Sequence, residues 1–172
     1  GAVVRWRWRR TNYDIWIMGA IDMVRGVSFK AIPSSYMLYQ ILKCISIEKY
    51  YWYNIDSQSE VWDKSRGTTF FEKEIYDGKS FFKRINVDHF IIFLKLQAYF
   101  TNSSFVDIHN YEEFKRSDCQ LILLIYDCQY VEIYAKNQTV SKEILENALT
   151  NHYTEIQYIT DSNDGRTKMD VL

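Results

Sequence analysis

Apolar and polar residues alternate with the period of a β-strand in several segments of the chain. The longest of these segments, residues 90–100, is rich in β-forming residues and predicts a central strand. The turn composition of residues 56–59 predicts a hairpin between the strands on either side, and residues 127–129 predict a second one. The expected strands cover residues 24–32, 50–55, 60–63, 90–100, 121–126, 130–135 and 155–160.

Helical spacing of apolar residues marks four further segments, each preceded by residues that commonly begin a helix. Strands and helices in this order predict an α+β fold, with a mixed, largely antiparallel sheet covered by helices. The layout also suits two split βαβ-like halves. The expected helices are residues 36–46 after Pro33, 79–85 after Asp77, 111–117 after Asn110 or Asp107, and 140–148 after Thr139 or Ser141.

Composition divides the chain into three parts. Residues 1–22 are an amino-terminal extension; the alternation of Trp and Arg over residues 3–18 predicts a hairpin, and a non-native leader is the other interpretation. Residues 23–160 are expected to form a single α+β domain. Residues 161–172 are expected to be a polar, solvated tail.

Charge narrows the choice of partners. The chain has a formal net charge of −1, so no overall field draws it to nucleic acid or to an acidic membrane. Residues 1–25 carry +3, which leaves −4 for residues 26–172. We therefore expect neither a nucleic-acid nor a membrane partner for the body of the protein. Association through Arg5–Arg10, where Trp6 and Trp8 interleave with arginines, is kept as an alternative.

Cysteines and apolar runs indicate the compartment. Cys44, Cys119 and Cys128 are odd in number and have no CxxC spacing, which favours free thiols over a disulfide framework or a zinc site. The longest apolar runs, residues 90–94 and 121–126, are far shorter than the roughly 20 residues of a membrane-spanning helix. These patterns predict a cytoplasmic protein.

Three short motifs carry a family resemblance. They are Arg25-Gly26-Val27-Ser28-Phe29, Tyr50-Tyr51-Trp52-Tyr53 and Tyr76-Asp77-Gly78-Lys79-Ser80-Phe81. Together they resemble a family of small proteins from spore-forming Gram-positive bacteria that is catalogued as a domain of unknown function. The resemblance covers roughly residues 23–160 and leaves the Trp- and Arg-rich start outside. It implies a bacterial, cytosolic protein and assigns no site residues.

Catalytic and ligand-binding motifs give no specific signal. The histidines, His89, His109 and His152, lack the HxH, HxxxH and HExxH spacings of metal ligands, so no metal site and no cofactor is predicted. Asp88 and His89 would pair only if the fold brought them together, because neighbours on a strand point to opposite faces. Asp107 could likewise pair with His109 only through the fold, and helix capping explains Asp107 as well. Lys79 and Ser80 end a Gly-Lys-Ser sequence, but Lys73 stands where a phosphate-binding loop has its first glycine. The sequence therefore predicts no catalytic residue.

Aromatic residues give the strongest functional hint. The chain holds 14 Tyr, 10 Phe and five Trp, its strongest departure from average composition, and such rings either fill a core or form a binding surface. We expect four of them to form a contact surface: Tyr51, Trp52, Tyr53 and Trp62. The prediction is a non-enzymatic, cytosolic binding protein whose partner is another protein or a second copy of the chain, with a small ligand left open. The alternative class is a small enzyme whose site is assembled from non-contiguous residues.

Overall fold

The computed structural model describes residues 16–17 and 20–172. The start of this range is a two-stranded hairpin in which β1 (Trp16–Ile17) pairs antiparallel with β2 (Ala20–Ile21). Most of the hairpin predicted over residues 3–18 lies outside the described residues, and so does all of the segment Arg5–Arg10.

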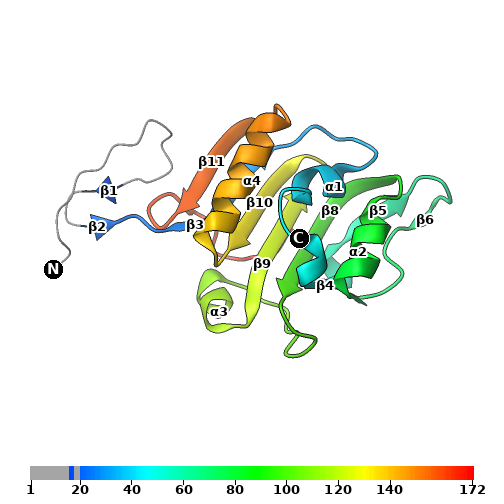
Figure 1. Ribbon diagram of the computed structural model, residues 1–172, viewed down its shortest axis with the longest axis horizontal. Helices are drawn as coiled ribbons and strands as arrows, with labels where there is room; N and C mark the ends of the chain where they lie inside the picture. The colour runs from blue at the N-terminus through cyan, green and yellow to red at the C-terminus, as the bar shows by residue number, and fades with distance from the viewer. Residues whose placement is uncertain (1–15, 18–19) are drawn as a thin grey trace.

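A nine-stranded antiparallel sheet organises the rest of the described chain (Figure 1). Seven strands follow the order β11-β3-β10-β9-β8-β4-β7, while β5 pairs with β8 and β6. The α+β class is thus confirmed. The split βαβ-like halves are not formed, because β8 and β9, which such a unit would place parallel on either side of a third strand, are antiparallel neighbours. The strands are β3 (Val24–Lys30), β4 (Tyr51–Asn54), β5 (Glu60–Asp63), β6 (Thr68–Thr69), β7 (Ile75–Tyr76), β8 (His89–Tyr99), β9 (Cys119–Tyr126), β10 (Tyr130–Ala135) and β11 (Thr154–Thr160).

Strand β8 is long enough to pair with two strands on one side. Its residues 96–99 pair with β4 and its residues 89–93 pair with β5. Between the pairs Glu60↔Phe93 and Val61↔Ile91 one residue of β8 has no partner, which is a β-bulge. The hairpin predicted between residues 50–55 and 60–63 is therefore wrong. The 3₁₀ turn η2 (Asp56–Gln58) instead carries the chain from one half of β8 to the other.

The described residues form four α-helices, three of which begin at a short polar side chain that caps them. They are α1 (Met37–Leu42), α2 (Gly78–Ile85), α3 (Tyr111–Arg116) and α4 (Gln138–Thr150), with a 3₁₀ turn η1 (Ile47–Lys49) after α1. Asp77 caps α2 and Asn110 caps α3, as expected. For α4 the expected caps are wrong: Asn137 accepts hydrogen bonds from the backbone N–H groups of Thr139 and Val140.

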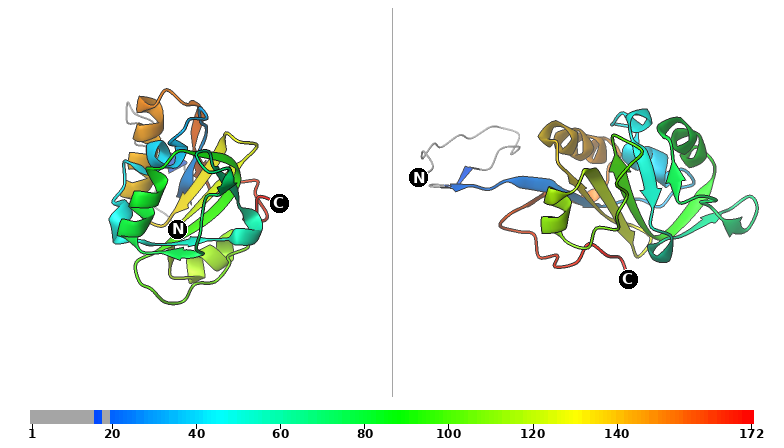
Figure 2. Two further views of the ribbon diagram at one scale, coloured as in Figure 1. Left: turned by 90° about the vertical axis from the view of Figure 1, so that its right-hand side faces the viewer. Right: turned by 90° about the horizontal axis from the view of Figure 1, so that it is seen from below.

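The two faces of the sheet are covered by different parts of the chain. In the right-hand view of Figure 2, α1, α2 and α4 lie along one face of the sheet, and the C-terminal segment, residues 161–172, crosses the other face. The helix-covered face holds the larger hydrophobic core, in which Trp52, Phe81 and Leu96 are wholly buried. We call the opposite side the back face. There a smaller core packs against α3 and the C-terminal segment, and it includes Tyr99, Phe114, Ile122 and Tyr134.

The C-terminal segment is a packed part of the fold, so the prediction of a solvated tail is wrong. Met169 is buried in the smaller core, and its backbone N–H donates to the carbonyl of His109. The Arg166 guanidinium binds the carboxylate of Glu132 on β10. The sequence of this segment is polar because its side chains form hydrogen bonds and ion pairs with the sheet, which composition alone does not distinguish from hydration.

A buried glycine fixes the spacing of the strands at the edge of the sheet. A Cβ atom on Gly26 would lie 1.9 Å from the backbone carbonyl oxygen of Ile133 on β10. Strand β3 is held between β10 and β11, so it cannot move away without breaking both ladders. We expect Gly26→Ala to lower the free energy of unfolding by about 3 kcal/mol, at the upper end of overpacking effects, measured by urea denaturation. Gly165→Ala is the control, because its Cβ meets nothing within 4 Å; equal stability of the two variants would contradict this explanation.

Candidate functional site

Strand alternation separates the four aromatic residues that the sequence predicts as a contact surface. Trp52 points into the larger core, where its ring stacks on Phe81 with centroids 4.4 Å apart and its Nε1–H donates to the carbonyl of Ile47. Trp52 is wholly buried and cannot contact a partner, so its assignment is wrong. Tyr51 and Tyr53 lie half-buried on the back face, where the ring of Tyr53 packs against Phe105.

Trp62 is exposed, and the sheet brings two further rings beside it. Trp62 and Phe90 are 40% and 38% exposed and are directly opposite each other on β5 and β8. Phe93 follows on the same face, because the bulge in β8 shifts the alternation by one residue. Trp62 Nε1–H donates to the carboxylate of Glu60, which is the strand partner of Phe93. We call Trp62, Phe90 and Phe93 the aromatic row; it lies on the back face beyond the part that the C-terminal segment covers.

A stack of rings and cations continues from the aromatic row across the back face. The pair Leu94↔Ile125 places Tyr126 next to Phe93, and Tyr126 and Tyr130 stack with centroids 5.5 Å apart. Arg166 lies over the ring of Tyr126, and Lys30 lies over the ring of Tyr130, each 5.7 Å from the ring centroid. Both tyrosines therefore offer mainly their edges and hydroxyl groups to a ligand. Burial, followed by the negative charge of Glu132, raises the pKa of Tyr126.

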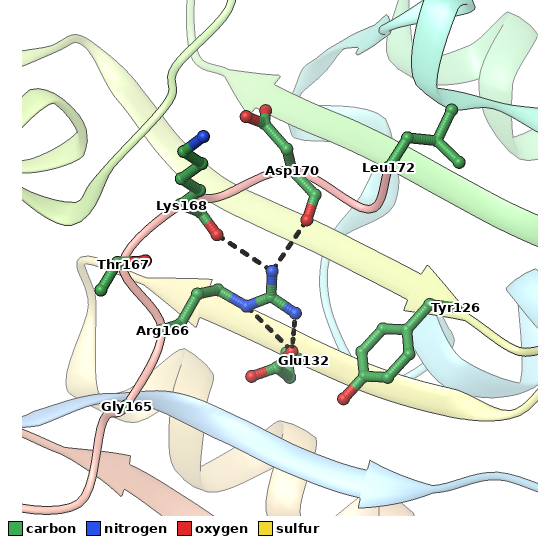
Figure 3. Close-up of a pocket in the computed structure, with 8 residues that line it drawn as sticks. All are labelled: Tyr126, Glu132, Gly165, Arg166, Thr167, Lys168, Asp170 and Leu172. Carbon is green, nitrogen blue, oxygen red and sulfur yellow. Dashed lines mark hydrogen bonds and ion pairs between the residues drawn. The ribbon is translucent and has the colours of Figure 1, made fainter.

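A groove of about 300 Å³ opens beside this stack. Two carboxylates, Glu132 and Glu155, line it, and neither a lysine nor an arginine is among its lining residues. We call it the acidic groove; its other lining residues are Ser28, Phe29, Tyr126, Tyr130, Val131 and Gln157. A second pocket of about 420 Å³ shares Tyr126 and Glu132 with it and is bordered by the C-terminal segment (Figure 3).

Arg166 forms the boundary between the two pockets. Its guanidinium binds one oxygen of Glu132 and donates to the backbone carbonyls of Lys168 and Asp170, at 3.0 and 2.8 Å (Figure 3). Because all these acceptors come from the protein, Arg166 is a structural clamp for the C-terminal segment. The other oxygen of Glu132, Oε1, accepts no hydrogen bond from the described residues and is free to serve the acidic groove.

A buried ammonium group holds the far part of the C-terminal segment. Lys95, on the back face of β8, is wholly buried and donates to Asp107 Oδ1 at 2.6 Å, the carbonyl of Ile108 at 2.6 Å and Asp170 Oδ1 at 3.1 Å. Burial opposes ionisation of Asp170, but hydrogen bonds from Gln58 and Lys95 outweigh it and lower the pKa of Asp170. Ligand atoms of Asp107, His109 and Asp170 also lie within 4.8 Å of one another, a spacing that suits a cation. The Lys95 ammonium already donates to both carboxylates, so the arrangement is an ion-pair network.

Of the two pairs weighed as acid–base catalysts, the fold brings His109 close to Asp107, whereas the ring of His89 is held by backbone groups. His89 is buried, its Nε2 accepts from the backbone N–H of Leu38 at 3.1 Å, and its Nδ1 lies 2.7 Å from the carbonyl of Val87. These partners require the neutral ring with the proton on Nδ1. His109 lies 3.4 Å from Asp170 Oδ1 and 3.9 Å from Asp107 Oδ2, at the rim of the Lys95 network. Cys44, Cys119 and Cys128 are free thiols, and burial raises the pKa of Cys44 and of Cys119 to about 12, far from that of a thiolate nucleophile.

The buried state of His89 predicts acid-sensitive stability. Burial lowers its pKa in the folded state below 6.5, the value of the unfolded chain. The stabilising contribution is therefore complete above pH 6.5 and is lost as the pH falls from there through the folded pKa, because the unfolded chain takes up the proton first. We expect urea denaturation between pH 8 and pH 5 to show this loss and His89→Gln to show a flatter profile. His152→Gln, at an exposed position, is the control; an unchanged profile in His89→Gln would contradict the assignment.

Sequence reasoning found one of the three members of the aromatic row. The sequence places Phe90 and Phe93 in a central strand. The local pattern does not show that their side chains lie on a part of the back face that stays exposed after β8 pairs with β5. Lys95 had a visible signal, a lone charge within the apolar run of residues 90–100. The acidic groove had none, because Ser28, Glu132 and Glu155 come from three strands that are far apart in sequence.

The fold and this site together define an α+β protein with an exposed aromatic and acidic surface on one sheet face. The family model described as "Protein of unknown function (DUF2691)" matches residues 24–170, and the chain belongs to this family. It is 36% identical over 157 residues to the Bacillus subtilis (strain 168) protein titled "Uncharacterized protein YncE", an alignment that covers 87% of this chain and 100% of the relative. No solved structure matches significantly. Among the described residues, no helix has the length and apolar character needed to cross a membrane.

Proposed function

We propose that the protein is a non-catalytic interaction module of the bacterial cytosol and that it binds a partner protein through the aromatic row. The observation that carries this proposal is the exposure of Trp62 and Phe90 side by side on a sheet face whose other part is covered. Adjacent exposed rings on a rigid sheet are typical of contact surfaces, because they bury large areas with little loss of side-chain entropy. The free thiols of Cys44, Cys119 and Cys128 agree with a reducing compartment.

The aromatic row supports binding because it is held in place before a partner arrives. Glu60 accepts the hydrogen bond from Trp62, and β8 lies between β5 and β9 within the sheet. A preorganised surface loses less entropy on association than a mobile loop does. Tyr51 and Tyr53 lie elsewhere on the back face and are not part of this proposal.

Site-specific photo-crosslinking in living cells tests the proposal. The full chain is expressed in Bacillus subtilis with p-benzoylphenylalanine at position 62 and, as the matched control, at position 36, where Tyr36 is 45% exposed. We expect a discrete crosslinked product from position 62 that position 36 does not give, and we expect Phe90→Ser to reduce it. No product at position 62, or the same products at both positions, would contradict an interaction through the aromatic row.

A further inference from the structure

We infer that the partner segment places a lysine or arginine side chain in the acidic groove and an apolar or aromatic side chain on the aromatic row. The inference rests on the proposed function and specifies the chemistry of the partner. It follows from the charge, the free acceptors and the position of the groove.

Charge complementarity identifies the occupant of the groove. Glu132 and Glu155 line it, and its remaining polar side chains, Ser28, Gln157 and the two tyrosines, are neutral. Arg166 forms an ion pair with Glu132, and Lys30 lies over the ring of Tyr130. The carboxylate of Glu155, by contrast, forms no ion pair with any described residue. A phosphate or another anion would be repelled here, whereas an ammonium or guanidinium group would be attracted.

The acceptors in the groove suit a cationic side chain in particular. Glu132 is largely buried, with 16% of its side chain exposed, and its Oε1 is unoccupied by the described residues. Glu155 lies at the irregular start of β11, where the register shifts and its own φ is 54°. An arginine or lysine has several donors on a long apolar stem, so it can reach such acceptors while its stem packs on neighbouring rings.

The groove and the aromatic row are close enough for one short segment to contact both. Tyr126 is next to Phe93 at the row and also lines the groove. Glu132 is on β10, two strands away from Phe93, which is about 10 Å across the sheet. Side chains two positions apart in an extended peptide lie about 7 Å apart on one face, and the long stem of an arginine or lysine covers the remaining distance. A segment with an apolar residue and a basic residue two positions apart therefore matches this surface.

Peptide binding to the full chain tests the inference. The probe is a fluorescein-labelled hexapeptide in which two phenylalanines are followed by two arginines between terminal serines, so that each phenylalanine shares a face of the extended chain with the arginine two positions on. Binding is followed by fluorescence anisotropy. The matched control peptide carries citrulline in place of arginine, which keeps the shape and removes the charge. We expect the arginine peptide to bind at least 10-fold more tightly and to lose this advantage at high salt.

Two protein variants distinguish this inference from the proposed function. Glu155→Gln is expected to weaken the arginine peptide several-fold and to leave the citrulline peptide unchanged, while Glu143→Gln, on the exposed side of α4, changes neither. Combined Trp62→Ser and Phe90→Ser is expected to weaken both peptides, with circular dichroism showing that the variants are folded. If the two peptides bound equally well and the double variant bound neither, the inference would be overturned and the proposed function would stand. No binding of the arginine peptide, or no effect of Glu155→Gln, would also overturn the inference.

Discussion

Replacing Lys95 with alanine is expected to lower the free energy of unfolding by about 3–5 kcal/mol, the range seen when one partner of a buried ion pair is removed. Lys95 is wholly buried and bonds two carboxylates and a backbone carbonyl. Without it, Asp107 and Asp170 repel each other next to an apolar core, and the carbonyl of Ile108 loses its donor. Urea denaturation at pH 7 measures the loss, and the C-terminal segment should also become more accessible to limited proteolysis.

A second readout separates the loss of charge pairing from a loss of packing. The pKa of Asp170 is lowered in the folded protein, so its stabilising ion pair is present at neutral pH and is lost as the pH falls through that lowered pKa. The stability difference between Lys95→Ala and the natural chain should therefore shrink as the pH is lowered from 7 toward 3. Lys115→Ala, which removes an exposed pair with Glu112, is the control and should cost less than about 0.5 kcal/mol. A pH-independent difference would show that Lys95 acts through packing alone.

Trp52→Ala is expected to lower the free energy of unfolding by about 3–5 kcal/mol, as other large-to-small changes in cores do. The Trp52 ring is wholly buried, stacks on Phe81 and joins β4 to α2 and η1, so its removal leaves a cavity that its neighbours cannot fill. Denaturation followed by far-ultraviolet circular dichroism measures the change without relying on tryptophan fluorescence.

Trp62→Ala is the matched comparison, because the same change is made at an exposed position on β5, the next strand along the chain. Trp62 makes one hydrogen bond, to Glu60, so the expected loss is below about 1 kcal/mol. This pair of variants tests which tryptophan belongs to the core and which to the surface. The assignment would be refuted if Trp62→Ala were the more damaging change.

Local pattern was sufficient for much of the secondary structure. The strand over residues 90–100, the hairpin around residues 127–129 and the helices capped by Asp77 and Asn110 follow from alternation, turn composition and capping. These signals depend on neighbours within a few residues, so no knowledge of the tertiary fold is needed. The three short motifs also predicted a family of unknown function from Gram-positive bacteria, and the family match and the Bacillus subtilis relative confirm it.

The partners of each strand could not be predicted from the local sequence pattern. Alternation shows that a strand has an apolar and a polar face, but it does not show which segment packs against each face. Residues 50–53 alternate in the same way whether Trp52 or its neighbours face the core, and only the sheet decides that Trp52 does. Likewise, a turn composition at residues 56–59 is compatible with a hairpin, but the length and bulge of β8 give β4 and β5 separate places on it.

The sequence by itself determined the α+β class, most helices and strands, and an unusual supply of aromatic residues. Tertiary structure alone decided which rings are exposed, that the C-terminal segment packs on the back face, and that Glu132 and Glu155 share a groove. The physical reason is range: hydrogen bonds within a helix or turn act over three or four residues, whereas the face of a sheet is made by strands more than 100 residues apart.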